Sequence, residues 1–197
     1  MIVKFFKRGG VTDNKFSTGG ESAKNYLLNE RVQQGTAQLL KGDPEETTEI
    51  INGLGFSKIF TSGCLSFDSE ESKKIDDELK QKLMNDFERS LFGDFDRSRI
   101  SGYWVEHTDK KNEKTGEPRL ELNFVIPKID LESQKSLNPY YHKADLKRVE
   151  LWQDLTNLEN SFTNPKDPSK ARTLETNSKE LHLSKDYETL DKTWLNV

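Results

Sequence analysis

The alternation of apolar and polar residues is clearest between residues 100 and 127. The stretch Arg119–Pro127 reads RLELNFVIP, and in a β-strand its apolar residues face one side while Glu121 and Asn123 face the other. Ile100–His107 alternates in the same way, and the intervening DKKNEKTGEP is dense in turn formers and charges. The pattern predicts a β-hairpin with a long loop, packed on one face and polar on the other.

The rest of the apolar pattern predicts further strands and helices. Strands are expected over residues 1–6 and 58–67, and helices over residues 22–34, 44–52, 70–91 and 144–158. In the segment 70–91, apolar residues recur at every fourth position with charges between them, which is typical of a helix lying on a sheet. The order of these elements predicts an α+β fold with a mainly antiparallel central sheet flanked by helices.

The composition fits a single domain with a highly charged surface. The chain has 197 residues, of which 32% are charged, and a mean hydropathy of -0.86. We expect the domain to span residues 1–160, followed by a mostly polar C-terminal extension over residues 161–197 that packs on it or trails from it. No apolar run approaches the ~20 residues of a membrane span or forms a signal peptide, so we expect a cytoplasmic protein without membrane insertion.

Charge, cysteine content and missing motifs exclude several classes of protein. The net charge of -4 argues against wholesale nonspecific binding of nucleic acid, although it leaves a local basic groove open. The single cysteine, Cys64, excludes an internal disulfide and a multi-cysteine zinc site, and we expect it to be a buried strand thiol. The sequence has no P-loop, dinucleotide-binding glycine fingerprint or zinc-finger spacing.

The polar face of the hairpin gathers three candidate metal ligands. If the hairpin closes around Lys114, His107 pairs with Glu121, and Asn123 follows on the same face. An imidazole nitrogen with a carboxylate and an amide oxygen suits Mn²⁺ or Mg²⁺, with positions left open for water or phosphate oxygens. Spacing alone leaves an alternative open, because a histidine at a strand end and a Glu-x-Asn pair on a solvent face are common.

Several segments in a fixed order carry a resemblance to a known family. They read MIVKF, AKNYLLNER, GDPEE, TSGCLSF, WVEH followed by RLELNFVIP, LNPYYHKAD, WQDLTN and NPKDPSKARTL, over about residues 1–175. In this order they resemble the mobilisation relaxases of small mobilisable plasmids, the MobA type of the MOBP class, in its HEN branch. The chain departs from that family in its longer hairpin loop and in His142, which stands where an aspartate is more usual.

The resemblance implies a DNA-nicking and strand-transfer enzyme with the palm-like sheet of HUH relaxases. Tyr26 is the implied nucleophile, and its attack would leave the 5′ phosphate on the tyrosine and free a 3′ hydroxyl, so that the strand can be rejoined. Tyr140 and Tyr141 remain rival nucleophiles. The implied metal ligands, with Mn²⁺ or Mg²⁺ as the ion, are the HEN triad of His107, Glu121 and Asn123.

The implied substrate is plasmid origin-of-transfer DNA, bound as a single strand with an adjacent hairpin or duplex. The candidate DNA-binding side chains are Lys110, Arg119, Lys143, Lys147 and Arg148. Candidates for stacking on a base are Trp104 and Tyr103. The candidate bases for the nucleophile are Asp109, Glu106 and Glu30. An accessory mobilisation protein and a type IV coupling protein are the implied partners.

Two other functions stay open beside the relaxase. A rolling-circle replication initiator would use the same tyrosine and metal at a replication origin. A catalytically silent DNA-binding module would recognise the origin and nick nothing. Under the leading interpretation, residues 1–160 are the relaxase catalytic domain, and the chain corresponds to the N-terminal part of a longer protein.

Overall fold

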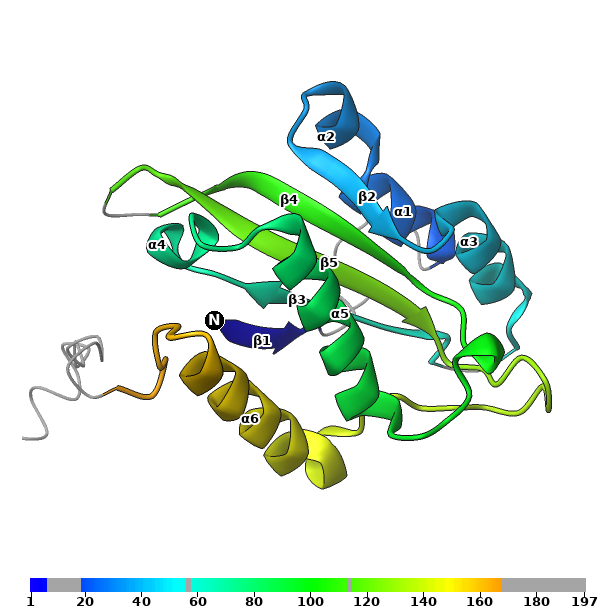
Figure 1. Cartoon of the computed structure of the whole chain (residues 1–197). Helices are drawn as coiled ribbons and strands as arrows, with labels where there is room; N and C mark the ends of the chain where they lie inside the picture. Colours follow the sequence, from blue (N-terminus) through cyan, green and yellow to red (C-terminus); the bar gives the residue numbers. More distant parts are fainter. Residues whose placement is uncertain (7–18, 56–57, 113–114, 168–197) are drawn as a thin grey trace, which may run out of the picture. The chain divides into compact units, whose positions relative to one another are not determined.

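An antiparallel sheet of five strands forms the centre of the fold. The computed structural model describes residues 1–6, 19–55, 58–112 and 115–167. The strands are β1 (Ile2–Phe5), β2 (Ala37–Lys41), β3 (Phe60–Ser66), β4 (Tyr103–Lys111) and β5 (Pro118–Pro127). They are hydrogen-bonded in the order β1-β3-β5-β4-β2, and each neighbouring pair is antiparallel (Figure 1). The sheet and its flanking helices confirm the predicted α+β fold.

Helices cover both faces of this sheet. They are α1 (Gly20–Leu27), α2 (Asn29–Gln33), α3 (Pro44–Gly53), α4 (Ser69–Ser72), α5 (Asp77–Phe92), the 3-10 helix η1 (Arg97–Arg99) and α6 (His142–Glu159). On one face, Leu27 and Ile51 pack on Tyr103, Val105 and Val125, so α1 and α3 form that layer. The alternation along the strands therefore separates two cores, one on each side of the sheet.

The larger core lies on the other face, beneath α5 and α6. Phe87 of α5 is at its centre, with ring centroids 5.2 Å from Phe124, 6.0 Å from Trp104 and 4.9 Å from Trp152. The indole N–H of the buried Trp104 donates to Glu88 Oε1 at 2.8 Å, so this donor is satisfied inside the core. Aromatic packing thus fixes α5 and α6 against the face opposite α1 (Figure 1).

The predicted helix over residues 22–34 is instead two helices, α1 and α2. The first residue of α1 is Gly20, two residues before the predicted start at residue 22, and the Gly20 amide donates to Asn52 Oδ1 of α3 at 3.0 Å. A Cβ on Gly20 would lie 2.9 Å from the Thr48 Cα, so only glycine allows this approach of α1 to α3. A tertiary contact therefore decides where the helix begins.

The predicted helix over residues 70–91 is also divided. Asp68 forms a capping box at the start of α4, and the Asp76 side chain accepts from Leu79 N at 2.8 Å to start α5. Two aspartates at N-cap positions make two helix starts out of one amphipathic pattern.

The short edge strand β2 was not predicted from the sequence. AQLLK has no clear alternation, and the strand exists because it pairs with β4, with a register shift between Leu39 and Lys41. The hairpin of β4 and β5 has the predicted register at its polar face, since His107 pairs with Glu121. A bulge between His107 and Lys110 then shifts the pairing, so that Lys110 lies opposite Arg119.

The chain divides into a unit of Met1–Asn164, described above, and a second unit that begins at Pro165. Residues 168–197 lie outside the described residues, so the predicted domain boundary near residue 160 and the polar extension stay predictions. Within the described part of the chain, no helix combines the length and the apolar character needed to cross a bilayer.

Candidate active site

Three polar side chains are buried next to one another on the face that α1 covers. The exposed fractions of His107, Glu121 and Asn123 are 2%, 8% and 2%. His107 lies directly opposite Glu121, and Asn123 is two residues further along the same strand, so all three point to one face. Directly opposed residues have Cβ atoms about 4.5–5.5 Å apart, which brings the three side chains into one cluster.

The end of α1 is joined to this cluster by a hydrogen bond. The Nε2 atom of His107 lies 2.7 Å from the carbonyl oxygen of Leu27, the last residue of α1. In an unbroken helix this carbonyl would accept from the amide of Arg31, four residues on, so the contact accompanies the break between α1 and α2. Because a carbonyl only accepts, Nε2 carries the hydrogen and Nδ1 keeps its lone pair.

Burial keeps His107 in its neutral form. Burial lowers the pKa of His107 and outweighs the opposing effects of the Leu27 carbonyl and the nearby carboxylates. A neutral imidazole whose other nitrogen is fixed by a carbonyl is the state in which histidine binds metal.

Glu121 is surrounded by a hydroxyl and two cations. Ser66 Oγ donates to its Oε1 at 3.2 Å, and Lys4 Nζ and Arg119 Nη2 lie 4.0 Å and 3.9 Å from the same oxygen. The Nε atom of Arg119 is buried without a hydrogen-bond partner among the described residues. Sequence reasoning missed Lys4, although its position between Val3 and Phe5 already places it on the polar side of β1.

The donor set suits a hard divalent cation. Among the described residues, no group of three histidine, cysteine, aspartate or glutamate side chains could hold a metal ion, so a site here depends on Asn123 as the third ligand. Asn123 Nδ2 lies 3.5 Å from the Val105 carbonyl oxygen and 3.4 Å from that of Glu121, which leaves Oδ1 as the ligand atom. One nitrogen and two oxygens fit Mn²⁺ or Mg²⁺ better than zinc.

Tyr26 lies in the last turn of α1, one residue before the contact with His107. Its side chain is 44% exposed and lines a cavity of about 360 Å³. The other residues that line this cavity are Asn25, Asn29, Glu30, Arg31, Gln34 and Asp109. The structure thus brings the sequence-predicted nucleophile to the helix end that contacts a predicted metal ligand.

Of the three candidate bases for Tyr26, two lie near it and one lies on the other face of the sheet. Asp109 and Glu30 line the cavity with Tyr26, whereas Glu106 points to the opposite face of the sheet and pairs with Lys80 Nζ at 2.7 Å. Burial acts to raise the pKa of Asp109, but the hydrogen bond and charge of the neighbouring arginine outweigh it, and the pKa lies below its usual value. Asp109 is therefore an ionised carboxylate and a weak base.

The rival tyrosines lie elsewhere. The Tyr140 ring stacks on Phe5 at 3.7 Å, in the layer of α5 and α6, and its hydroxyl lies 2.9 Å from His142 Nδ1. Tyr141 precedes the first residue of α6. Of the three tyrosines, Tyr26 is the one carried by the helix that contacts His107.

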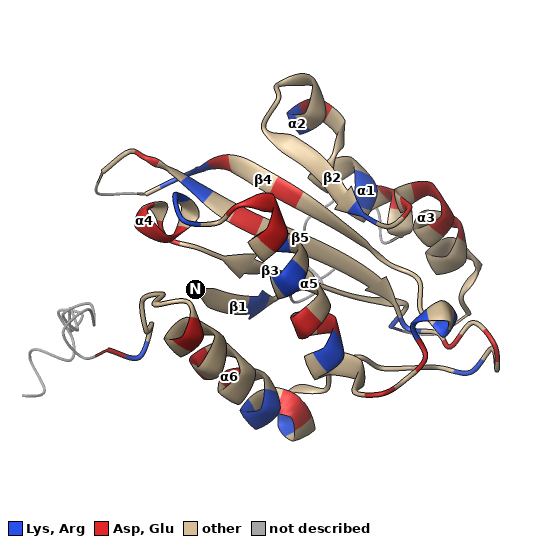
Figure 2. Ribbon diagram, viewed as in Figure 1, with Lys and Arg blue, Asp and Glu red and all other residues tan. Residues whose placement is uncertain are grey.

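The candidate DNA-binding residues fall into two groups. Lys110 and Arg119 oppose each other across the hairpin, beside Glu121. The other three belong to α6, whose ribbon is blue near its start in Figure 2, and α6 packs on the opposite face of the sheet. They are Lys143, Lys147 and Arg148. Arg148 is already bound to Asp145 Oδ1 at 3.1 Å. Their role in binding DNA stays a prediction.

The expectation that Trp104 or Tyr103 stacks on a base is wrong for this structure. Trp104 is 2% exposed and Tyr103 is 1% exposed, because the first packs against Phe87 and the second lies beneath α1 and α3. Cys64, in contrast, is the buried free thiol that was predicted, at 1% exposure.

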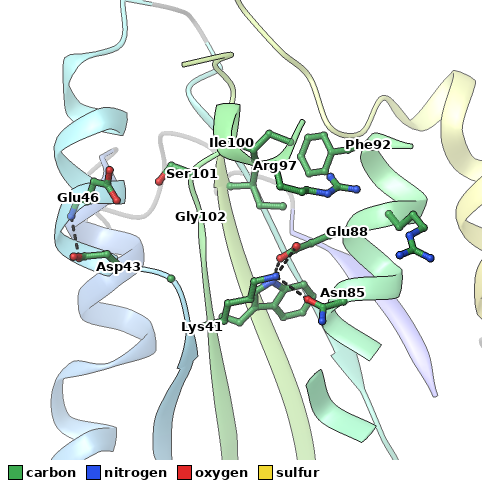
Figure 3. A pocket seen from close by; sticks show the side chains of 14 residues that line it. Lys41, Asp43, Glu46, Asn85, Glu88, Phe92, Arg97, Ile100, Ser101 and Gly102 are labelled. Atoms are coloured by element: carbon green, nitrogen blue, oxygen red, sulfur yellow. Dashed lines mark hydrogen bonds and ion pairs between the residues drawn. The ribbon is translucent and has the colours of Figure 1, made fainter. Parts of the chain in front are cut away.

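A second cavity, of about 520 Å³, lies between α3 and α5 near the start of β4. Figure 3 shows Lys41 pointing to α5, where its Nζ is 2.7 Å from Glu88 Oε2 and 2.9 Å from Asn85 Oδ1. Glu88 also accepts from the indole of Trp104. On the α5 side of this cavity, Lys41, Asn85 and Glu88 therefore bind one another as a structural network.

Comparison with known proteins gives two relatives. Cryptic plasmid protein C of Neisseria gonorrhoeae is 42% identical over 181 residues, which are 92% of this chain and 80% of that protein. DNA relaxase MbeA of Escherichia coli is 40% identical over 174 residues, which are 88% of this chain and 30% of that protein. No family model and no solved structure matches the chain. The assignment to the MOBP class and its HEN branch stays a prediction. At these identities and coverages, the chain belongs to the plasmid relaxase-type family that the two relatives represent.

Proposed function

We propose that the chain is a metal-dependent DNA relaxase that nicks one strand at a plasmid origin of transfer through Tyr26 and later rejoins it. The name of the relative MbeA supports relaxase activity, although the chain spans only 30% of that protein. The observation that carries the proposal is the 2.7 Å contact between His107 and Leu27, which attaches the helix end bearing Tyr26 to the buried polar triad.

The reaction is a transesterification that conserves the phosphodiester bond. The Tyr26 oxygen attacks the scissile phosphorus and loses its proton to water or a nearby base, while the bond from phosphorus to the 3′ oxygen breaks. The departing 3′ oxygen takes up a proton, and the 5′ phosphate stays on the tyrosine. Attack by a 3′ hydroxyl reverses these steps, so rejoining needs no external energy source.

His107, Glu121 and Asn123 would hold the Mn²⁺ or Mg²⁺ ion. Bound there, the ion supplies positive charge that offsets the charge developing on the phosphate oxygens. His107 contributes by staying neutral, because burial lowers its pKa. Its hydrogen bond to Leu27 also keeps the end of α1 in place over the triad.

The substrate of this proposal is origin-of-transfer DNA as a single strand with an adjacent hairpin or duplex. Lys110 and Arg119, next to Glu121, suit phosphates close to the nick. Lys143, Lys147 and Arg148 would need DNA that extends around to α6. An accessory mobilisation protein, a type IV coupling protein and a cytoplasmic location belong to the same proposal.

Nicking of supercoiled plasmid DNA tests the proposal. The protein is incubated with the supercoiled plasmid of its source and Mn²⁺ or Mg²⁺, the reaction is stopped with detergent, and open circles carrying bound protein are sought. Tyr26→Phe and chelation of the metal should each abolish the adduct, whereas Tyr141→Phe should retain it. An adduct that persists in Tyr26→Phe would assign the nucleophile to another tyrosine.

The same assay separates the two alternatives. Nicking at a replication origin in place of the transfer origin would indicate a rolling-circle initiator. Salt-sensitive binding of the origin without nicking, unchanged in Tyr26→Phe, would indicate a silent DNA-binding module.

A further inference from the structure

Arg31 is in contact with both the side chain and the backbone of Tyr26. Its guanidinium carbon lies over the tyrosine ring, 4.6 Å from the centroid. Its Nη1 atom donates to the carbonyl oxygen of Tyr26. A guanidinium stacked on an aromatic ring in this way is attracted to the face of the ring, and it restricts the rotation of the ring. Arg31 therefore limits the directions in which the Tyr26 hydroxyl can point.

Asp109 holds the other side of the guanidinium. Its Oδ2 atom accepts from Arg31 Nε at 3.0 Å, and it comes from β4, two residues after His107. Arg31 is thus bound between the helix end that carries Tyr26 and the strand that carries a triad residue. This contact sets the position of Tyr26 relative to the triad through side chains as well as through the backbone.

The backbone of Arg31 is fixed as well. Its carbonyl oxygen accepts from the amide of Thr36 at 2.9 Å, and the carbonyl of Thr36 accepts from the amide of Thr108 on β4 at 3.0 Å. The pairing of β2 with β4 begins directly after this point, at Ala37 opposite His107. The backbone of Arg31, in α2, is therefore tied to the edge of the sheet through Thr36.

The charge of Arg31 is permanent in this setting. Burial acts to lower the pKa of Arg31, but the contacts with Asp109 and Tyr26 outweigh it and raise the pKa. Its side chain is 21% exposed, so solvent and an anion can still reach it from the cavity. With Nε on Asp109 and Nη1 on the Tyr26 carbonyl, Nη2 is the nitrogen best placed to turn toward a phosphate oxygen.

We infer that Arg31 is a positioning residue for Tyr26, which aims the phenol oxygen and offers its remaining guanidinium nitrogen to the scissile phosphate. Asp109 serves to hold Arg31 in that orientation. The inference rests on the proposed function, since it takes Tyr26 as the nucleophile. Under this inference, the cavity of about 360 Å³ binds a backbone phosphate of the DNA.

The inference makes a quantitative prediction for the rate of nicking. Removing one preorganised donor to a reacting oxyanion costs roughly 10²–10³ in rate, and a donor that also orients the nucleophile belongs in that range. Arg31→Ala should therefore slow adduct formation about 100-fold or more at saturating DNA, while the Kd for DNA changes less than about threefold. Arg31→Lys keeps the positive charge but loses the planar guanidinium and its stacking on the Tyr26 ring. Its rate of adduct formation should lie between those of wild type and Arg31→Ala.

Single-turnover cleavage of an end-labelled single-stranded oligonucleotide that spans the nick site measures these rates. Arg89→Ala is the matched control, because Arg89 lies on α5 on the other side of the sheet and lines the second cavity. Added guanidinium ion at millimolar concentration should restore much of the rate of Arg31→Ala and have no effect on Arg89→Ala. Thermal melting shows whether each variant is folded, and Arg31→Lys decides the matter if Arg31→Ala melts early.

The outcomes distinguish this inference from the proposed function. Wild-type protein that forms no adduct would refute the function itself. Wild-type protein that forms the adduct, with Arg31→Ala within threefold of its rate, would overturn the role of Arg31 alone. A slow and folded Arg31→Ala that guanidinium does not rescue, with Arg31→Lys equally slow, would also overturn it.

Discussion

Replacing Lys4 by methionine should strengthen binding of Mn²⁺ to the DNA-free protein. Lys4 Nζ lies 4.0 Å from Glu121 Oε1 and donates to Ser66 Oγ at 3.3 Å, so it competes with any cation for the carboxylate. Two unit charges at about 4 Å interact by roughly 4 kcal/mol at an effective dielectric constant of about 20. The side chain of Lys4 is 43% exposed, however, and solvent screening reduces such pairs to about 0.5–1 kcal/mol.

That difference corresponds to a dissociation constant lower by about two- to fivefold. The free Mn²⁺ signal in an electron paramagnetic resonance titration measures it without any nicking activity. Lys82→Met is the matched control, since Lys82 is an exposed residue of α5 that pairs with Asp86 at 3.0 Å. Raising the salt concentration should shrink the difference between Lys4→Met and wild type. An unchanged or weaker affinity in Lys4→Met would refute the reasoning that Glu121 is a ligand shared with the two cations.

Three further predictions concern the fold. Gly42→Ala should destabilise the protein by about 2 kcal/mol or more in urea unfolding, because φ at Gly42 is +82° and a Cβ would lie 2.0 Å from a backbone carbonyl oxygen. Gly53→Ala, where a Cβ would meet nothing within 4 Å, should change stability little. Glu71→Gln should cost about 3 kcal/mol, since the buried carboxylate binds the N-terminal amine at 2.7 Å, whereas the exposed Glu70→Gln should be nearly neutral; equal losses would contradict this. Burial raises the pKa of Cys64 to about 12, so iodoacetamide should label it slowly at pH 8 until urea unfolds the chain, and rapid labelling of the folded protein would contradict its burial.

The amino-acid sequence by itself determined the hairpin and its polar face. Side chains alternate along a strand, so RLELNFVIP could bury its leucines only by turning Glu121 and Asn123 to the other side. The turn formers between the strands placed the centre of the hairpin, and the pairing of His107 with Glu121 followed. These features depend on contacts close in sequence, which a pattern of residue types records directly.

The tertiary structure alone decided what covers this face. Leu27, Arg31 and Asp109 come from three elements, and they meet because α1 packs on α3 and because β2 pairs with β4. The edge strand β2 has no alternation of apolar and polar residues, so no local pattern predicted it. Likewise α6 carries its lysines to the opposite face because its apolar side packs with α5. Packing between distant segments is set by the shapes of whole faces, and no single segment of sequence contains that information.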